Sequence, residues 1–294
     1  MVVVGLFAIG RHDTTQLSHV HLRVRPLVLL AAVPPYAIGS LWLALGWREQ
    51  LDAFGTRLPA MTAVRLWWRA QLARYVPTGL AAFASRAALA AGVGVPAAVG
   101  AASLALELTE LVGWCGVGAA AFLPSSSMGL PYRLVLGLGA AGGLALLPVS
   151  YRRLAALGGR IRGLAALGST PARPRALYWA SLVYAASLAA RTLAFVIFGA
   201  ALLTVSAGDG RLLAGSVLAA AIVGIIGVTP AGLGVREGAM VALLRTRFGV
   251  GDAAALAVAW RAWEFTFEIA WLAIGTAFGP RLTPVRAPTP EARA

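Results

Sequence analysis

Six charged residues of this 294-residue sequence lie inside long apolar stretches. They are Glu107, Glu110, Arg191, Arg261, Glu264 and Glu268. In apolar surroundings such as a bilayer core, a charged side chain costs at least about 2.5 kcal/mol, so it is paired, hydrated or functional. Arginine binds phosphate through its planar fork of donors, and a carboxylate can orient that fork or take up a proton. These residue types predict a site for an anionic group.

Helical spacing places these charges on two helix faces, because residues three, four or seven positions apart share one face of an α-helix. One face carries Arg261, Glu264 and Glu268, and the other carries Glu107, Glu110 and Trp114. We expect both faces to point towards each other or towards a shared cavity.

The same charges have a simpler interpretation as salt bridges that hold helices together. Arg261 could pair with Glu107, and Arg191 could pair with Glu264. Paired charges inside membranes do serve helix packing, so the residue types alone leave a structural role open beside a binding role.

Two glycine-containing segments predict breaks in helices. Residues 229–238 read TPAGLGVREG, with Arg236 and Glu237 in the first turn of the following helix. Unwound backbone before a helix start offers free N–H groups to an anion, although a tight turn between helices explains the pattern equally well. Residues 75–79 read YVPTG. The residues that break the two helices are Pro77, Gly79, Pro230, Gly232 and Gly234.

Composition excludes a water-soluble domain. The sequence is 59% hydrophobic and 12% charged, whereas soluble domains are about 25% charged. The formal net charge of +14 comes from arginine alone, because the sequence contains no lysine. The arginines cluster in loops and at helix ends, which argues against a nucleic-acid partner and favours contact with anionic lipid headgroups.

The residues that most often hold metals or cofactors are scarce and scattered. Cys115 is the single cysteine and lies in an apolar run, so we interpret it as a packed residue. His12, His19 and His21 have no acidic or cysteine partners at metal-site spacing and are interpreted as interfacial. We therefore expect no metal, no cofactor and no catalytic constellation.

Apolar length predicts an all-α, polytopic membrane bundle, since a bilayer core of about 30 Å needs about 20 apolar residues per helix. Pro34-Pro35 predicts a kink in the first span. The five predicted spans are Leu27–Trp47, Ala97–Leu123, Tyr132–Val149, Ala176–Val205 and Ala253–Phe278.

Three further segments do not read as simple spans. Residues 48–74, rich in arginine and carrying Trp67 and Trp68, are typical of a helix in the membrane interface. Residues 75–91 are too short to cross twice and predict a re-entrant hairpin. Residues 212–228 either cross the membrane or form the first arm of a second re-entrant hairpin that closes near Phe248.

Arginine placement predicts the orientation. Residues 150–175 contain six arginines, which marks this loop as cytoplasmic, and the uncharged residues 124–131 then lie outside. The arginine-containing tail falls inside only if residues 212–248 form a hairpin, so we prefer that arrangement. The first span then runs from outside to inside.

The two halves of the sequence share a pattern. When Glu107 is aligned with Glu264 in the sequence, Trp114 aligns with Trp271. A slightly different offset aligns the Pro-x-Gly of the first break with that of the second. The match of two glutamates is notable because the sequence has only 11 acidic residues. It predicts an inverted repeat with hairpins entering from opposite sides, as in many transporters, although coincidence in an alanine-rich chain is the alternative.

Three regions follow from these patterns. Residues 1–26 form a poorly defined N-terminal segment, residues 27–279 form the transmembrane domain, and residues 280–294 form a disordered cytoplasmic tail. The expected location is the inner (plasma) membrane, with multiple passes.

The two break segments, together with Arg86, Glu107 and Arg261, resemble the lysylphosphatidylglycerol synthase transmembrane (flippase-like domain) family. The resemblance runs from about residue 27 to residue 279, and residues 229–238 are its more specific part. It implies an integral membrane protein associated with lipid translocation. The soluble synthase domain that some members carry is lacking, so no synthase activity is implied. Two departures are Thr78, which separates Pro77 from Gly79, and Ala231, which stands where the family commonly has glycine.

We therefore predict a transporter, not an enzyme, that moves an anionic lipid or polyprenyl-linked headgroup through a polar cavity. Membrane lipids are the expected partners, and the oligomeric state is left open. The alternatives are a membrane-embedded enzyme acting on a lipid phosphate, with Glu237 or Glu264 as general base, and a non-catalytic partner subunit. The predicted substrate-binding residues are Arg86, Glu107, Glu110, Arg191, Arg236, Glu237, Arg261, Glu264 and Glu268.

Overall fold

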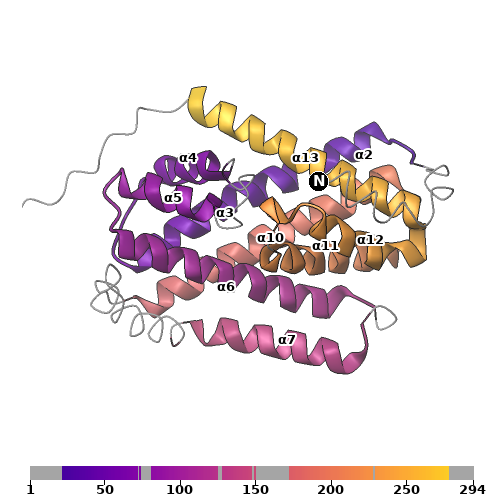
Figure 1. Cartoon of the computed structure of the whole chain (residues 1–294), viewed down its shortest axis with the longest axis horizontal. Helices are drawn as coiled ribbons and strands as arrows, with labels where there is room; N and C mark the ends of the chain where they lie inside the picture. The colour runs from indigo at the N-terminus through magenta and orange to yellow at the C-terminus, as the bar shows by residue number, and fades with distance from the viewer. Residues whose placement is uncertain are drawn as a thin grey trace, which may run out of the picture.

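The computed structural model describes residues 22–71, 73, 81–124, 128–147, 149, 172–227 and 229–277, and their regular structure is all helical, as predicted. The three histidines, residues 150–171 and the C-terminal tail lie outside this part. The helices are α2 (Pro26–Ala31), α3 (Val33–Ala53), α4 (Ala60–Gln71), α5 (Ala81–Ala91), α6 (Ala97–Phe122), α7 (Leu130–Ala145), α10 (Pro174–Leu202), α11 (Asp209–Ile226), the 3-10 turn η2 (Pro230–Gly232), α12 (Val235–Phe248) and α13 (Val250–Ala277). Figure 1 shows them packed as one bundle.

Four helical stretches are long and apolar enough to cross a membrane: Pro26–Ala53, Ala97–Phe122, Pro174–Leu202 and Asp209–Ile226. The first is interrupted at Ala32, next to the Pro34-Pro35 pair that predicts a kink. Helix α7 is shorter, with 16 residues, and α13 is long enough with 28 residues but carries the three charges named above.

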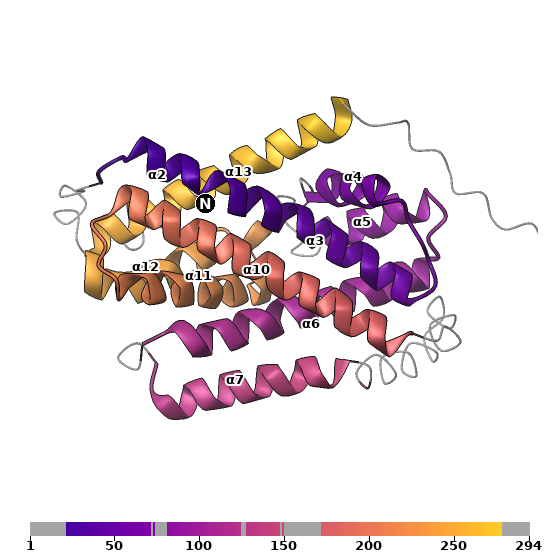
Figure 2. The same cartoon turned by 180° about the vertical axis from the view of Figure 1, so that it is seen from behind.

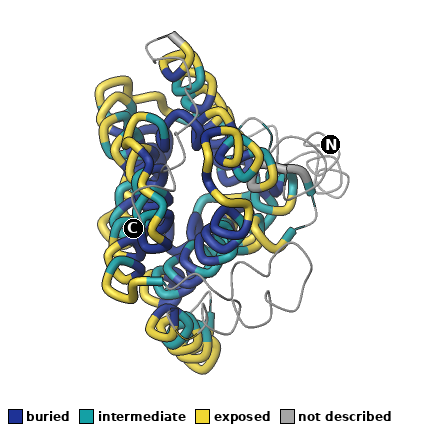
Figure 3. The backbone as a smooth tube through the Cα atoms, turned by 90° about the vertical axis from the view of Figure 1, so that its left-hand side faces the viewer, coloured by how far each residue is buried: buried dark blue, intermediate teal, exposed yellow. Residues whose placement is uncertain are grey.

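The outer surface of the bundle is apolar. Figure 3 shows buried residues gathered between the helices and exposed residues on the outside. On α7, Tyr132 is 74% exposed, Val135 75% and Leu138 70%. Water-soluble monomers rarely expose a contiguous apolar surface of this kind, so the chain is a helical membrane protein.

Helices α3 and α10 form an antiparallel pair along their whole length. The Arg23 amide donates to the Leu202 carbonyl at 2.9 Å at one end, and the Arg173 amide donates to the Ala53 carbonyl at 3.0 Å at the other. Midway, the Ser187 hydroxyl donates to the Gly39 carbonyl at 2.7 Å. Glycine lets the two backbones approach closely, as is common between membrane helices.

We expect Gly39→Ala to destabilise the protein by about 1–3 kcal/mol, the usual cost of overpacking a tight contact. A Cβ at Gly39 would lie 2.6 Å from Arg191 Cγ and 2.8 Å from the Ser187 carbonyl oxygen. Denaturant unfolding in detergent micelles measures the effect. Gly139→Ala in α7 is the matched control, since nothing lies within 4 Å of its Cβ position. Equal stabilities of the two variants would contradict the close packing of α3 on α10.

Two helical hairpins enter the bundle from opposite ends (Figures 1 and 2). Helices α4 and α5 form one hairpin, at the end where α3 finishes, and helices α11 and α12 form the other. In the second hairpin, Arg247 near the end of α12 donates to Asp209 at the start of α11 at 2.7 Å. The hydrogen bond to the Asp209 carboxylate raises the pKa of Arg247. The η2 turn breaks the chain between α11 and α12, as residues 229–238 predict, whereas Pro77 and Gly79 lie outside the described residues. Whether either hairpin is re-entrant remains a prediction.

Helix α4, which the sequence predicts to lie in the membrane interface, buries its tryptophans against protein. Trp67 and Trp68 are buried, and Trp68 stacks on Trp271 of α13 with ring centroids 4.5 Å apart. The Arg65 guanidinium donates to the Gly275 carbonyl at 3.0 Å. The aromatic face of α4 therefore packs against protein, because α13 offers it a complementary aromatic surface.

The two halves repeat the same order of a long helix, a hairpin and a long helix: α3, α4–α5, α6 and then α10, α11–α12, α13. In each half the two long helices contact each other. Trp47 of α3 donates to Ser103 of α6 at 3.0 Å, while Phe195 of α10 packs on Trp260 of α13 with centroids 5.0 Å apart. Because α3 and α10 run in opposite directions, this order is the one that the predicted inverted repeat requires.

Candidate functional site

A cavity of about 380 Å³ lies where the two halves meet. Its walls come from α3, α4, α5, α6, α10, α11, α12 and α13, so both hairpins contribute. Much of the lining is apolar. The charged residues in the lining are Arg86, Glu107, Arg191, Arg236, Glu264 and Glu268. All six are predicted site residues, and the bundle brings them to one space.

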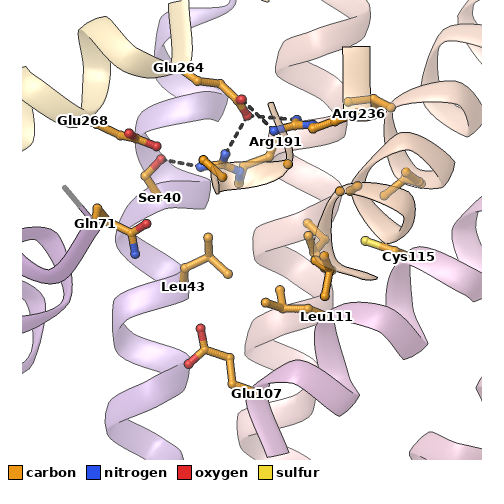
Figure 4. Close-up of a pocket in the computed structure, with 18 of the residues that line it drawn as sticks. Ser40, Leu43, Gln71, Glu107, Leu111, Cys115, Arg191, Arg236, Glu264 and Glu268 are labelled. Atoms are coloured by element: carbon orange, nitrogen blue, oxygen red, sulfur yellow. Dashed lines mark hydrogen bonds and ion pairs between the residues drawn. The ribbon is translucent and has the colours of Figure 1, made fainter. Parts of the chain in front are cut away.

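Glu264 is the centre of the largest cluster (Figure 4). Its carboxylate is 1% exposed and accepts two hydrogen bonds from Arg236, at 2.7 and 3.1 Å, and one from Arg191 at 3.1 Å. Arg261, one turn earlier on α13, lies 3.5 Å from the same carboxylate. Three helices, α10, α12 and α13, therefore supply three guanidinium groups to one glutamate.

Arg191 is also held from the side of α3. Its guanidinium donates to the Ser40 hydroxyl at 3.0 Å and lies over the Tyr36 ring, 4.5 Å from the centroid. These contacts fix the orientation of the side chain, since a cation above an aromatic face is attracted to it. Ser40 and Tyr36 are missing from the predicted site because neither type signals a function in an apolar stretch.

The helix break positions the second arginine of the cluster. Gly232 has φ +69, and a Cβ there would lie 2.8 Å from Gly224 Cα, so only glycine fits this close approach to α11. Ala231 is also in the left-handed region, with φ 53, and its carbonyl accepts a hydrogen bond from Arg261 at 2.9 Å. The turn places Arg236 in the first turn of α12, facing Glu264.

Glu237 occupies the start of α12. Its carboxylate accepts a hydrogen bond from the Gly234 amide at 2.7 Å and lies 3.8 Å from Arg261. The protein's own side chain therefore fills the place where an anion could meet free N–H groups at the helix start. Arg236 and Arg261, not free N–H groups, are therefore the cationic groups beside this helix start.

A second ion pair lies apart from this cluster. Arg86 of α5 pairs with Glu107 of α6, and both side chains are 3% exposed. The Arg86 guanidinium lies 5.1 Å from the centroid of Trp47 and 5.8 Å from that of Trp67. Figure 4 shows Glu107 well below Glu264 in the same pocket. Each half of the bundle thus brings a buried glutamate and its arginine partners to the cavity: Arg86 with Glu107 from the first half, and three arginines with Glu264 from the second.

One of the two predicted ion pairs is present. Arg191 pairs with Glu264, but Arg261 does not pair with Glu107, because Arg86 takes that carboxylate and Arg261 lies within α13's own cluster. Charges on neighbouring helices can be grouped from sequence, whereas the partner of each depends on how the helices cross.

Glu110 shares a helix face with Glu107, but it is not part of the cavity lining. It is fully buried, and its Oε2 accepts a hydrogen bond from Gln50 at 3.0 Å. Glu268 is buried and lines the cavity one turn beyond Glu264. Cys115, predicted to be a packed residue, is buried at the cavity wall.

Several tryptophans of the cavity wall have buried N–H groups without acceptors in the described part of the chain. Within the described residues, the indole N–H groups of Trp67, Trp68, Trp260 and Trp271 have no hydrogen-bond partner, and all four residues line the cavity. Buried donors are normally satisfied, so these four are exceptions among the indole groups of the bundle.

Among the residues that the structure describes, no group of three histidine, cysteine, aspartate or glutamate side chains is placed to hold a metal ion. Comparisons with models of known protein families, with curated proteins and with solved structures found no match for this chain.

Proposed function

We propose that this membrane protein is a flippase-like transporter that carries the headgroup of an anionic lipid, or of a polyprenyl-linked lipid, through the cavity between its two halves. One observation carries the proposal: Glu264 holds two arginines inside a cavity of the membrane bundle. Arg236 donates two hydrogen bonds to the carboxylate, which is the geometry by which arginine also binds a phosphate.

The carboxylate of Glu264 stands where a headgroup phosphate would bind. A carboxylate and a phosphate each present two oxygens that accept hydrogen bonds from one guanidinium fork. An incoming phosphate can therefore replace the carboxylate without leaving the arginines unpaired. Arg261, 3.5 Å from Glu264, stays beside the displaced carboxylate, so the exchange leaves neither anion without a cation in an apolar environment.

The size of the cavity suits a headgroup. Its volume of about 380 Å³ lies at the low end of ligand pockets, which span about 300–1,000 Å³. Acyl chains gain nothing by leaving lipid for a charged space, so they stay in the bilayer while the headgroup moves. The inverted repeat supports this proposal, since transporters of that kind bind their substrates between the repeats. The resemblance to the flippase-like family points the same way.

Translocation in proteoliposomes tests the proposal. The purified chain is reconstituted with phosphatidylglycerol that carries a fluorescent acyl label, and a membrane-impermeant quencher reports the fraction in the outer leaflet over time. We expect the chain to accelerate movement of the anionic lipid over protein-free vesicles, and Arg191→Gln with Arg236→Gln to abolish the acceleration. No acceleration for labelled phosphatidylglycerol, phosphatidic acid or a polyprenyl phosphate, with or without a proton gradient, would overturn it.

A further inference from the structure

Glu110 is a fully buried carboxyl group that the proposed headgroup site does not use. Its Oε2 accepts a hydrogen bond from the neutral amide of Gln50, at 3.0 Å, and its Oε1 has no partner within the described residues. No arginine of the described part lies within ion-pair distance of it. Every other buried glutamate of the bundle contacts an arginine or lines the cavity.

A carboxylate in this setting is costly. An ionised group with neither a cation nor water beside it pays the full desolvation cost, and uptake of one proton removes the charge. The protonated acid also donates one hydrogen bond, which an ionised carboxylate cannot. The amide of Gln50 can accept that bond, since the Gln50 Oε1 also lacks a partner within the described residues.

The groups around Glu110 define where its proton could go. Glu107 lies one turn earlier on the same face of α6, and Tyr184 of α10 lies beside both carboxyls. Arg86 of α5 is the nearest cation of the site and is paired with Glu107. Helix α3 presents Gln50, which is two residues from the partly exposed Asp52.

The remaining helices that pack on α6 bring no titratable group to Glu110 in the described part of the chain. Arg133 of α7 donates to the Ala120 carbonyl, and Arg211 of α11 donates to the Ala121 carbonyl, both near the far end of α6. Glu110 thus lies one turn from the cavity carboxylate of Glu107 and contacts α3 through Gln50.

We propose that Glu110 is a proton-binding site that couples headgroup movement to a proton gradient, an inference that rests on the proposed transport function. A proton from cavity water binds the Glu107 carboxylate, which releases Arg86 to the headgroup phosphate. Glu110, which already holds a proton, releases that proton on the side of α3 where Gln50 lies, and Glu107 then passes its own proton to Glu110. The restored Glu107 carboxylate pairs again with Arg86 and displaces the phosphate, so one proton enters from the cavity and one leaves on the α3 side per cycle.

Two measurements test the coupling separately from transport itself. Infrared spectra of the wild-type chain and of Glu110→Gln are recorded in lipid at neutral pH. Their difference should show the carbonyl band of one protonated carboxylic acid, present in the wild type and absent from the variant. Glu49→Gln, which removes a partly exposed acid near the end of α3, should leave that band in place. Glutamine has the shape of the protonated acid, so Glu110→Gln is expected to fold, which thermal unfolding checks.

The second measurement repeats lipid translocation with an imposed pH gradient. For one coupled proton, the wild-type rate should change by up to about tenfold per pH unit, while Glu110→Gln should move lipid at a rate independent of the gradient. Glu49→Gln should behave as the wild type.

The outcomes separate the two proposals. A band that is absent from the difference spectrum, or wild-type transport that ignores the gradient, would overturn the role of Glu110 and leave the flippase proposal standing. Absence of any lipid movement by the wild type would overturn the flippase proposal and the coupling with it. The infrared band would still decide whether Glu110 holds a proton.

Discussion

Glu264→Gln is expected to lower the free energy of unfolding by about 3–5 kcal/mol, the cost of removing one partner from a buried ion pair. Glu264 is 1% exposed and contacts Arg191, Arg236 and Arg261. Glutamine has nearly the same shape but no charge, so three guanidinium groups would share the cavity wall without their central anion. Chemical unfolding in mixed micelles measures the change.

The control for this variant is Glu49→Gln, which removes the same charge from a salt bridge nearer the surface. Glu49 pairs with Arg48 at 2.6 Å, with side chains 23% and 35% exposed, so the loss should stay below about 1 kcal/mol. A double-mutant cycle adds a second check. Combining Glu264→Gln with Arg236→Gln should cost less than the sum of the single variants, because each partner is unpaired without the other. Additive losses, or equal losses for Glu264 and Glu49, would contradict the role assigned to the cluster.

Arg236→Lys should slow movement of the anionic lipid by about 10- to 100-fold. Arg236 offers two donors to one carboxylate, at 2.7 and 3.1 Å, and lysine presents a point charge that cannot reproduce the fork. Loss of one hydrogen bond to a charged group costs about 1.5–3 kcal/mol, and each 1.36 kcal/mol changes a rate about tenfold. The initial rate of translocation in proteoliposomes is the readout.

Arg211→Lys is the matched control, because Arg211 is exposed and contacts the Ala121 carbonyl outside the cavity. This variant should move lipid at the wild-type rate. If Arg236→Lys folds normally and moves lipid as fast as Arg211→Lys, the fork of Arg236 has no part in binding the headgroup.

The membrane helices are the part of the fold that sequence predicts well. The predicted span Ala97–Leu123 corresponds to α6 at Ala97–Phe122, and Ala176–Val205 corresponds to α10 at Pro174–Leu202. Lipid demands about 20 apolar residues with all backbone bonds made locally, which leaves a strong linear signal. The packing of α4 leaves no such signal, because Trp67 and Trp68 suit a membrane interface as well as a contact with α13.

The sequence predicts which residues form the site but not which of them pair with one another. Charged residues in apolar stretches are rare, so Glu107 and Glu264 stand out from the sequence alone. Which arginine meets each of them depends on helix crossings far apart in the chain, and the pairing of Arg261 with Glu107 was therefore wrong. Glu110 shows the same limit, since spacing places it on the face of Glu107 but cannot show that its hydrogen bond comes from Gln50.

The central claim is that an anionic headgroup takes the place of Glu264 beside Arg191 and Arg236. A cryo-EM structure of the chain in nanodiscs that contain phosphatidylglycerol tests it most directly. The account predicts a phosphate in the cavity within hydrogen-bond distance of both guanidinium groups, with the Glu264 carboxylate displaced from at least one of them. A cavity that holds only water, with Glu264 still bound to both arginines, would contradict it.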